Sequence, residues 1–373
     1  MGCFFAEESM DLFFWIVFWI STALIVAVLF GYAAVCKAIA KRKGPIESLA
    51  PNEWPSVAIV VPVFNEEKFI RQKLENVLKV DYPADRLTCL VVDNGSADRT
   101  AEIIREYPVT LLQCGRGKNK AINAGLAATR AEIVVVTDVD TIVEPSAVKE
   151  VVGLIRGNIG AASGLVTIRK ENKPYMRSKL RFHAYDWEMR YTEGLIDSAC
   201  SLDGRFLAFR HDLVKELPDK AIIDDLEITF IVRKQDYRCV VSMNTPVLEA
   251  CPETIWAEIV QIRRRVSTTL VTMGHYWTMI FNPRYGFFGA VTQPFRRVFA
   301  LTLPAFMVYD LAFLTCKLGL WVLWAALGGL LLMIAVGEVF PFLQLIGIIL
   351  GWLHIILRRV RPGGLWQRIE RKN

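Results

Sequence analysis

The stretch VVVTDVDTIV, from Val134 to Val143, places two carboxylates directly behind a run of strand-forming residues. Charged side chains are poor members of a buried strand, so Asp138 and Asp140 are expected just beyond its carboxyl end. In an open α/β sheet, ligands bind in the crevice outside the carboxyl ends of the strands. The stretch therefore predicts a buried strand that ends at a polar, ligand-binding rim.

The central part of the chain repeats this alternation of short apolar runs and stretches with a helical period. The expected strands are Val57–Pro62, Leu87–Val92, Val109–Gln113 and Ile133–Thr137, and the expected helices are Glu66–Lys79, Ala97–Tyr107 and Lys118–Arg130. Continuous Val, Ile and Leu strands that alternate with helices indicate an α/β fold with a mainly parallel sheet covered on both faces.

Polar residues follow three of these strands at the points where they end. Asp93 follows the second strand, Asp138 the fourth, and the segment Val63–Glu67 the first. A turn-starting role would explain Asp93 or Asp138 alone, because Asp often opens turns. Three strand ends that deliver polar groups to one rim instead favour a binding crevice.

Two carboxylates one residue apart suit Mg²⁺ or Mn²⁺, which completes its coordination shell with water and substrate phosphates. The sequence contains neither GxxxxGK[ST] nor GxGxxG, which disfavours a P-loop or a dinucleotide-binding site. We therefore expect a diphosphate that is held by a metal ion and cationic side chains.

Both ends of the chain have the composition of membrane segments. Leu12–Cys36 has no charged residue over 25 residues, a length of about 37 Å as a helix, against about 30 Å for a bilayer core. Lysines and an arginine follow at 37–43, so this flank should be cytoplasmic and the N-terminus should face outward. The net charge of +6 is thus attributed to membrane flanks, and a nucleic-acid partner is not expected.

Three further apolar runs lie at Val298–Cys316, Leu318–Gly337 and Val339–Leu357. The first contains Pro304 and Asp310, and a buried Asp is costly if it faces lipid. The basic tail at 358–373 should prefer the cytoplasm. Three membrane crossings after a cytoplasmic domain would instead put the tail on the outer side. Either the first run is interfacial or re-entrant, or the tail departs from the rule.

The expected organisation has seven parts. They are an extracytoplasmic terminus at 1–11, a membrane helix at 12–36, a linker at 37–54, a cytoplasmic α/β domain at 55–250, amphipathic interface helices at 251–297, two to three membrane helices at 298–357, and the basic tail at 358–373.

Seven segments, in order, resemble the motifs of family 2 glycosyltransferases, which have the nucleotide-sugar-binding GT-A fold. They are PVFNEE (Pro62–Glu67), VVDNGSADRT (Val91–Thr100), GKNKAINAGL (Gly117–Leu126), TDVD (Thr137–Asp140), LDGRFLAFRHDLV (Leu202–Val214), IIDDLEIT (Ile222–Thr229) and QIRRR (Gln261–Arg265). Their order resembles the membrane-embedded branch that contains hyaluronan, chitin and cellulose synthases. The resemblance implies an inverting transfer of a sugar from a nucleotide sugar, a UDP-sugar in that branch, to an acceptor hydroxyl at the bilayer.

The resemblance also implies roles for individual residues. Donor contacts are expected from Pro62, Phe64, Asn65, Glu67, Asp93, Lys118 and Asp138. Asp140 and Asp138 are expected to ligate Mg²⁺ or Mn²⁺. Asp225 would be the general base with Asp224 beside it, Gly204 would belong to the acceptor-side loop, and Gln261, Arg264 and Arg265 would lie over the diphosphate and the acceptor.

Simpler explanations exist for two of these groups. Asp224 and Asp225 open an expected helix, where acidic residues are favoured by the helix dipole. The arginines at 263–265 belong to an amphipathic stretch and could meet anionic lipid headgroups. Both explanations are compatible with additional roles in catalysis.

The sequence departs from the family pattern at Arg265, where a Trp associated with the acceptor of processive synthases is usual. Trp187, Trp256 or Trp277 could substitute for it. Two acceptors therefore stay open: a growing polysaccharide and a membrane lipid. A non-catalytic sensor or scaffold that binds nucleotide sugars is a separate class, and it predicts the loss of catalytic positions that this chain retains.

Overall fold

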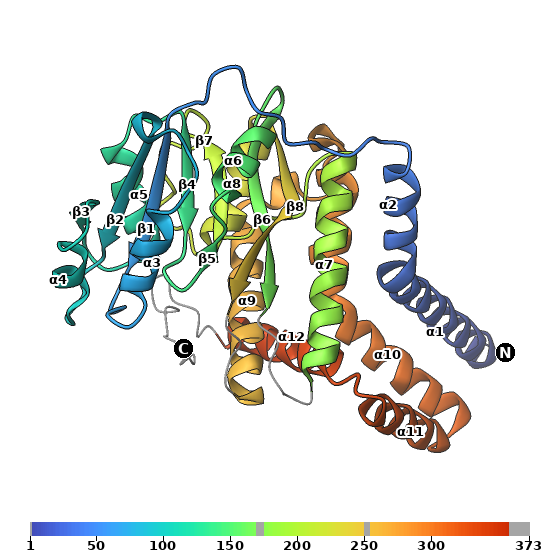
Figure 1. Cartoon of the computed structure of the whole chain (residues 1–373). Coiled ribbons are helices and arrows are strands. Elements are labelled where there is room, and N and C mark those ends of the chain that lie inside the picture. The colour runs from blue at the N-terminus through green and yellow to red at the C-terminus, as the bar shows by residue number, and fades with distance from the viewer. Residues whose placement is uncertain (1, 169–174, 250–253, 358–373) are drawn as a thin grey trace.

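The computed structural model describes residues 2–168, 175–249 and 254–357 (Figure 1). An eight-stranded sheet forms its centre, in the order β3-β2-β1-β4-β7-β6-β8-β5. The strands are β1 (Val57–Val63), β2 (Leu87–Asp93), β3 (Thr110–Gln113), β4 (Ile133–Thr137), β5 (Ile142–Val143), β6 (Ile159–Ile168), β7 (Phe206–Arg210) and β8 (Arg238–Glu249). Four of the seven strand pairings are parallel, so the sheet is mainly parallel as predicted.

Helices cover both faces of this sheet and extend beyond it. Those of the domain are α3 (Ile70–Val77), α4 (Thr100–Ile104), α5 (Lys118–Ala128), α6 (Ala147–Leu154), α7 (Met176–Ile196), α8 (Asp224–Lys234) and α9 (Ile255–His275). The flanking ones are α1 (Gly2–Val26), α2 (Tyr32–Ala40), α10 (Ala300–Leu318), α11 (Trp321–Ala335) and α12 (Phe340–Ile356).

The four strands expected from the sequence form the parallel half of the sheet. Ile133–Thr137 has the predicted bounds, and the other three differ by a residue at one end. The helices predicted at 66–79 and 97–107 are shorter, because the residues before them form hydrogen-bonded loops instead of helical turns. One such bond runs from the Glu66 N–H to Thr100 Oγ1 at 2.8 Å, and another from the Thr100 N–H to Asp98 Oδ1 at 3.0 Å.

Strand β1 is buried along its whole length, as expected for a strand with helices on both faces. Its alternating side chains enter different clusters: Ile59 and Val61 on one face, Ala58 and Val60 on the other. Helix α5 approaches β1 so closely that a Cβ on Gly125 would lie 2.6 Å from Val60 Cγ1. This close approach fixes the first residue of α5, Lys118, beside the carboxyl ends of the strands.

Two helices among the described residues are long and apolar enough to cross a membrane, Met10–Ala40 and Phe288–Leu318. They extend from the sheet side by side at α1 and α10 (Figure 1). The rings of Phe18 and Phe313 stack at 5.1 Å, and Thr22 Oγ1 donates to Asp310 Oδ2 at 2.9 Å. The Asp that was costly in the sequence thus has a hydroxyl partner from the other helix.

The helices extend beyond the residues expected to cross the membrane. The N-terminal helix begins at Gly2 and continues to Ala40, and its long apolar part is Met10–Ala40. The helix that contains Pro304 and Asp310 begins at Phe288, because two π-helical segments at 288–292 and 294–299 continue into α10. Residues 288–297 are thus helical and continuous with α10.

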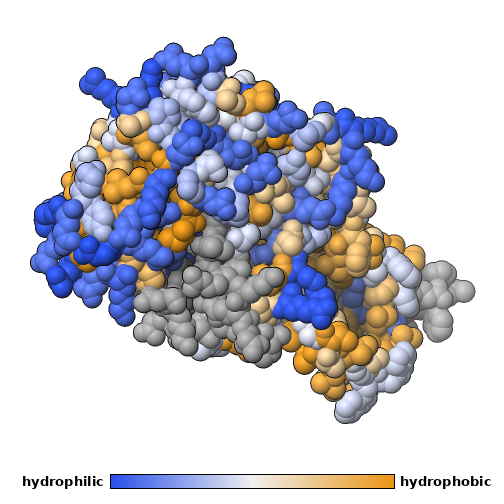
Figure 2. Space-filling view, in the orientation of Figure 1, coloured by the Kyte–Doolittle hydropathy of each residue, from blue (hydrophilic) through white to orange (hydrophobic). Residues whose placement is uncertain are grey.

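The two later apolar runs form shorter helices than the first. Helices α11 and α12 have 15 and 17 residues, or roughly 22 and 26 Å, less than the ~30 Å of a bilayer core. The exposed side chains of α11 include Trp321, Trp324 and Leu332, and the protruding end of the molecule is largely apolar (Figure 2). The basic tail at 358–373 lies outside the described residues.

Helix α12 packs on α9, which carries Gln261–Arg265, and two glycines allow this contact. A Cβ on Gly347 would lie 2.3 Å from Ile262 Cγ2, and one on Gly351 would lie 2.5 Å from Val266 Cγ1. Gly328 in α11 has no atom within 4 Å of its Cβ position. Small residues at a helix crossing let the two backbones approach closely.

The α9–α12 contact predicts opposite effects for two equivalent substitutions. Gly347→Ala should destabilise the protein by about 1–3 kcal/mol through overpacking and lower turnover, because it displaces α9. Gly328→Ala should be neutral or slightly stabilising, because alanine favours helix by up to about 1 kcal/mol. Thermal unfolding in detergent checks both, and equal melting temperatures for the two variants would contradict the packing described here.

Candidate active site

The loops after β1 and β2 are joined by hydrogen bonds at the rim of the sheet. Asp93 ends β2 and accepts from the Ser96 N–H at 3.0 Å. Asn65, in the left-handed region at φ 53°, accepts from the Ala97 N–H at 2.8 Å, and its own N–H donates to Ser96 Oγ at 2.9 Å. Asn tolerates this backbone region better than most residues. The two predicted donor-contacting segments therefore form one continuous edge.

The remaining residues of the first motif take different positions along this edge. The guanidinium of Arg116 lies 4.7 Å from the centre of the Phe64 ring, and Glu67 is an exposed residue of the loop. Pro62 pairs with Val92 inside the sheet and is buried. Pro62 thus lies one residue short of the rim and supports it from below.

Lys118 joins the end of β4 to the start of α8. Its ammonium lies 2.8 Å from Asp138 Oδ1 and 3.0 Å from Asp224 Oδ2. Burial alone would lower the pKa of Lys118, but the two carboxylates together hold it above its ordinary value. The predicted donor-side and base-side carboxylates are therefore brought together around one cation.

A second lysine, which the sequence reasoning missed, lies beneath the Asp138–Asp140 turn. Lys73 is fully buried, and its ammonium donates to Thr137 Oγ1 and to the Thr141 carbonyl, both at 2.8 Å. Burial lowers the pKa of Lys73 to about 7, and the charge of Asp138 acts in the opposite direction. The burial of Lys73 could have been predicted from its position among Ile70, Leu74 and Val77, because the helical spacing puts it on the apolar face of the helix.

The acceptor-side loop approaches the first turn of α8 at Gly204. The Gly204 N–H donates to Asp225 Oδ2 at 3.2 Å, and a Cβ at this position would lie 3.1 Å from Asp224 Oδ2. Burial first, and then the charges of Asp224 and Asp203, raise the pKa of Asp225 from 3.8 to about 6. A carboxyl group with a pKa near neutrality is suited to act as a general base.

Helix α9 places its arginines near the two sides of this site. Gln261 is buried, so one face of α9 packs against protein. Burial and then Arg265 lower the pKa of Arg264, while Asp138 acts to raise it. Arg265 is exposed, and the carboxylates whose charges act on it are Asp203, Glu258 and Asp225.

Other charged residues near the loop were also missed. Asp203 holds Arg205 through two contacts, 2.7 Å to Nε and 2.6 Å to Nη2. Arg190 of α7 donates to the Ser201 and Leu202 carbonyls at 3.2 and 3.1 Å, and its Nε lies 2.9 Å from Asp186. Two features of the sequence could have predicted these ion pairs: the DGR sequence at 203–205, and the four-residue spacing of Asp186 and Arg190.

The three tryptophans proposed as substitutes differ in exposure. Trp187 is buried in the core and lies under Arg190, whose guanidinium is 5.0 Å from the ring. Trp256 and Trp277 are 66 % and 71 % exposed, as is usual for interfacial anchors.

The donor atoms available at the Asp138–Asp140 turn fit a divalent ion that shares its ligands with a substrate. Among the described residues, no three His, Cys, Asp or Glu side chains gather to hold a metal by themselves. Mg²⁺ commonly uses only one or two protein carboxylates and takes the rest from phosphates and water. One oxygen of Asp138 contacts Lys118, and Asp140 stays the candidate ligand expected from the sequence.

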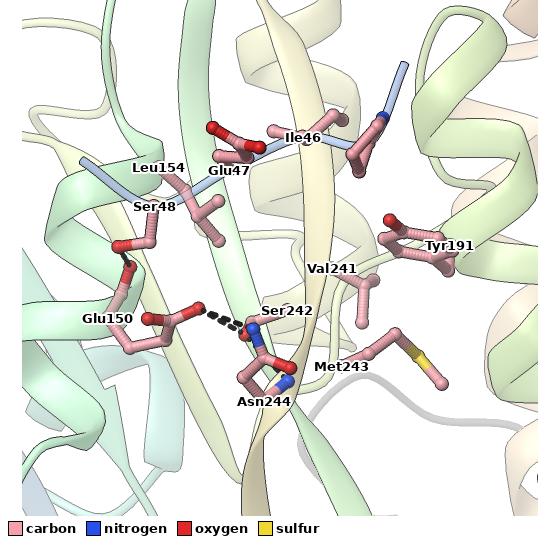
Figure 3. Close-up of a pocket in the computed structure, with 11 residues that line it drawn as sticks. Ile46, Glu47, Ser48, Glu150, Leu154, Tyr191, Val241, Ser242, Met243 and Asn244 are labelled. Carbon is pink, nitrogen blue, oxygen red and sulfur yellow. Dashed lines mark hydrogen bonds between the residues drawn. The ribbon is translucent and has the colours of Figure 1, made fainter. Parts of the chain in front are cut away.

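A separate cavity of about 430 Å³ lies beside the linker that follows α2 (Figure 3). Its walls include Glu47, Glu150, Tyr191 and Asn244, and Glu150 accepts from Ser242 Oγ at 3.1 Å. It contains none of the predicted site residues. The carboxyl ends of β1, β2 and β4 therefore remain the candidate active site.

A solved structure shares this fold. The mannosyltransferase PcManGT from Pyrobaculum calidifontis, in complex with GDP-Man and Mn²⁺, matches with a TM-score of 0.74 at 22 % sequence identity, and the match covers 92 % of this chain and 100 % of that one. At this coverage the likeness includes helices outside the sheet domain. The fold is therefore that of the GT-A glycosyltransferases.

The sequence comparisons agree with the fold. Residues 58–217 match the family described as Glycosyl transferase family 2. The chain is 28 % identical over 211 residues to the beta-monoglucosyldiacylglycerol synthase of Synechocystis sp. (52 % of this chain, 44 % of the relative). It is 24 % identical over 241 residues to the poly-beta-1,6-N-acetyl-D-glucosamine synthase of Staphylococcus epidermidis (60 % and 57 %).

The chain thus spans about half the length of these curated relatives. Residues 58–217 form a family 2 glycosyltransferase domain.

The position of Lys118 between two carboxylates predicts a large effect of removing its charge. Lys118→Gln should destabilise the protein by about 2–4 kcal/mol, because it leaves Asp138 and Asp224 without their shared cation. The exposed pair of Lys149 and Asp81 (2.7 Å) provides the control. Lys149→Gln should cost less than about 1 kcal/mol, and chemical denaturation compares the two. Similar losses in both variants would contradict the central place given to Lys118.

Proposed function

We propose that this protein is a membrane-integrated, inverting glycosyltransferase that transfers a sugar from a nucleotide sugar to the hydroxyl of a membrane lipid. The observation that carries the proposal is the convergence of Asp138, Lys118, Asp224 and Asp225 at the carboxyl end of β4. These residues come from three separate segments, which is typical of an assembled active site.

The mechanism follows from the charges on the two sides of the site. Asp225 removes the proton of the acceptor hydroxyl, whose oxygen attacks the anomeric carbon while the bond to the diphosphate breaks. Negative charge grows on the leaving phosphate, and Lys118 and Arg264 stabilise it. A single displacement inverts the anomeric configuration and needs no second nucleophilic carboxylate.

Asp140, with Asp138 beside it, would hold Mg²⁺ or Mn²⁺ at the diphosphate. The ion would act there as a Lewis acid that offsets the charge of the leaving group. The nucleotide is expected to be uridine diphosphate, and release of nucleoside diphosphate from a panel of UDP- and GDP-sugars identifies the donor.

A lipid acceptor is favoured over a translocated polymer because Arg265 stands where a Trp associated with the acceptor of processive synthases is usual. Phe18 and Phe313 stack, Ser21 Oγ donates to the Phe306 carbonyl at 3.4 Å, and Thr22 contacts Asp310. The described parts of α1 and α10 thus contact each other directly. The relatives' names include both a lipid and a polysaccharide product, so the sizing of reaction products decides between them.

The orientation proposed for the membrane places the active site in the cytoplasm. The basic residues at 37–43 directly follow the first long helix and precede the linker to β1. Cytoplasmic loops carry such an excess of Lys and Arg. A non-catalytic sensor remains the alternative, but it gives no reason to retain a base with a raised pKa beside Asp224.

The raised pKa of Asp225 predicts the acid side of the pH profile. The base is active when ionised, so kcat/KM should fall below about pH 6, by about tenfold for each further unit. Asp224→Asn removes one cause of the raised pKa and should move this limb to lower pH in the residual activity. A profile that is flat down to pH 5 would rule out Asp225 as the base.

The substitution Asp225→Asn tests the role of Asp225 as general base without a pH profile, because it removes the ionisable group. Sugar transfer should fall by about 10²–10⁴-fold, the usual range for loss of general base catalysis, while nucleotide binding by calorimetry should change little. Full turnover in this variant would remove the assignment.

Chelation tests the metal. EDTA should abolish sugar transfer by the enzyme purified from membranes, and added Mg²⁺ or Mn²⁺ should restore it. Asp140→Asn should raise the metal concentration needed for half-maximal nucleotide binding, whereas Asp212→Asn, on an exposed pair with Arg210, should not. An enzyme that is indifferent to EDTA would contradict the metal assignment.

A further inference from the structure

The carboxylate of Glu193 in α7 connects the sheet domain to both long apolar helices. Helix α7 contacts β8 on one side and α2 on another (Figure 1), and the Glu193 side chain is fully buried. One of its oxygens accepts from the Tyr32 hydroxyl at 2.8 Å and lies 3.0 Å from Arg296 Nε. Its other oxygen accepts from the Cys200 N–H at 2.8 Å. One buried group thus joins a residue from each long helix to the segment that begins at Cys200.

The second long helix provides three polar side chains to this segment. Gln293, Arg296 and Arg297 follow one another at spacings of three and one residues. Gln293 Nε2 donates to the Cys200 carbonyl at 2.8 Å, and Arg296 Nη2 lies 3.6 Å from Cys200 Sγ. Arg297 Nη2 donates to Ser201 Oγ at 2.8 Å. A polar group on an apolar helix is costly without a partner, and these three find partners just before the acceptor-side loop.

Both long helices are π-helical where they provide these contacts. Residues 294–299 form one π-helical segment, and residues 27–31, directly before Tyr32, form another. The two segments contact each other, and the rings of Tyr32 and Phe295 stack at 5.3 Å. π-Helical turns are rare and are frequently found at functional sites. The apolar helices therefore change their local backbone at the place where they meet the sheet domain.

The segment 200–204 connects these contacts to the proposed base. The Leu202 N–H donates to Thr229 Oγ1 at 3.0 Å, and the Thr229 hydroxyl donates to the Asp225 carbonyl at 2.7 Å. The Gly204 N–H donates to Asp225 Oδ2 at 3.2 Å. Buried backbone groups are almost always paired, and here the pairs run from the long helix at one end of the segment to the proposed base at the other.

We propose that Gln293 and Arg297 are positioning residues for sugar transfer, and that they hold the 200–204 segment at the place where Asp225 meets the acceptor. The inference rests on the proposed function and adds to it a dependence of turnover on the long helix. The contacts of both side chains are with Cys200 and Ser201, so they act through this segment and not on the reacting atoms. A displacement of about 1 Å at an active site can lower turnover about a hundredfold.

A role in positioning differs from a role in binding the donor. The residues proposed for the diphosphate, Lys118 and Asp138, lie at the carboxyl end of β4 and are joined to each other. The loss of a contact at Cys200 or Ser201 leaves that pair in place. The expected defect is therefore in the rate of transfer, with unchanged affinity for the nucleotide sugar.

The experiment measures sugar transfer by the full-length protein in vesicles made from the lipids of the cells that naturally produce it, with a panel of labelled UDP- and GDP-sugars. Gln293→Met keeps the length of the side chain and removes its donor, and Arg297→Gln removes the guanidinium. Each should lower kcat by about 10- to 100-fold and leave the KM for the nucleotide sugar unchanged. Arg297→Lys keeps a cationic donor and should recover part of the rate.

A double-mutant cycle tests the contact itself. Ser201→Ala removes the acceptor of the Arg297 hydrogen bond and should lower kcat as much as Arg297→Gln does. The double variant should be no slower than either single one, because both remove the same interaction. The control is Arg284→Gln, an exposed arginine of the short helix at 283–285, which should behave as the wild type. The stoichiometry of nucleoside diphosphate binding by calorimetry gives the folded fraction of each variant, to which kcat is normalised.

Three outcomes would overturn the inference. They are a wild-type kcat in the folded fraction of Gln293→Met and Arg297→Gln, fully additive losses in the double variant, and a defect in nucleotide binding in place of turnover. The first would show that these contacts only support the fold. Absence of transfer by the wild type with every donor would instead refute the proposed function itself.

Discussion

The candidate site depends on one ammonium group. Lys118 lies between Asp138, at the end of β4, and Asp224, at the start of α8. Without this cation, two carboxylates would face each other in a partly buried space, at a cost of several kcal/mol. The interaction therefore joins the donor side of the site to the helix that carries the proposed base, Asp225.

Close backbone contacts hold that ammonium in place. Gly125 allows α5 to approach Val60, which positions Lys118 at the rim, and Gly204 allows the acceptor-side loop to reach Asp224. Lys73 supports the Asp138–Asp140 turn from below through Thr137 and Thr141. Contacts with the sheet, α3 and α5 thus hold the rim in position, and its remaining side is open to the substrates.

The donor side of the site gathers cations around Asp138. Lys118 and Arg264 lie near Asp138, where a diphosphate and a metal ion would share charge. Arg265, the next residue of α9, is exposed.

Local patterns in the sequence predicted the parallel half of the fold, and the site residues stay predictions. Ile133–Thr137 is buried and purely apolar up to Thr137, so the end of this strand could be predicted from the sequence. The motif residues could then be placed at the ends of the strands. Strands β6 to β8 were not predicted, because the pairing of β7 between β4 and β6 depends on contacts distant in sequence. Lys73 was missed for a related reason: a lysine in an apolar stripe usually reaches solvent.

A structure of the protein with its nucleoside diphosphate and Mn²⁺ tests the central claim most directly. The account predicts that the diphosphate lies between Lys118 and Arg264, that the ion contacts Asp140, and that Asp225 faces the open acceptor side. A nucleotide bound elsewhere, for example in the cavity beside the 45–48 linker, or an ion remote from Asp140, would contradict it.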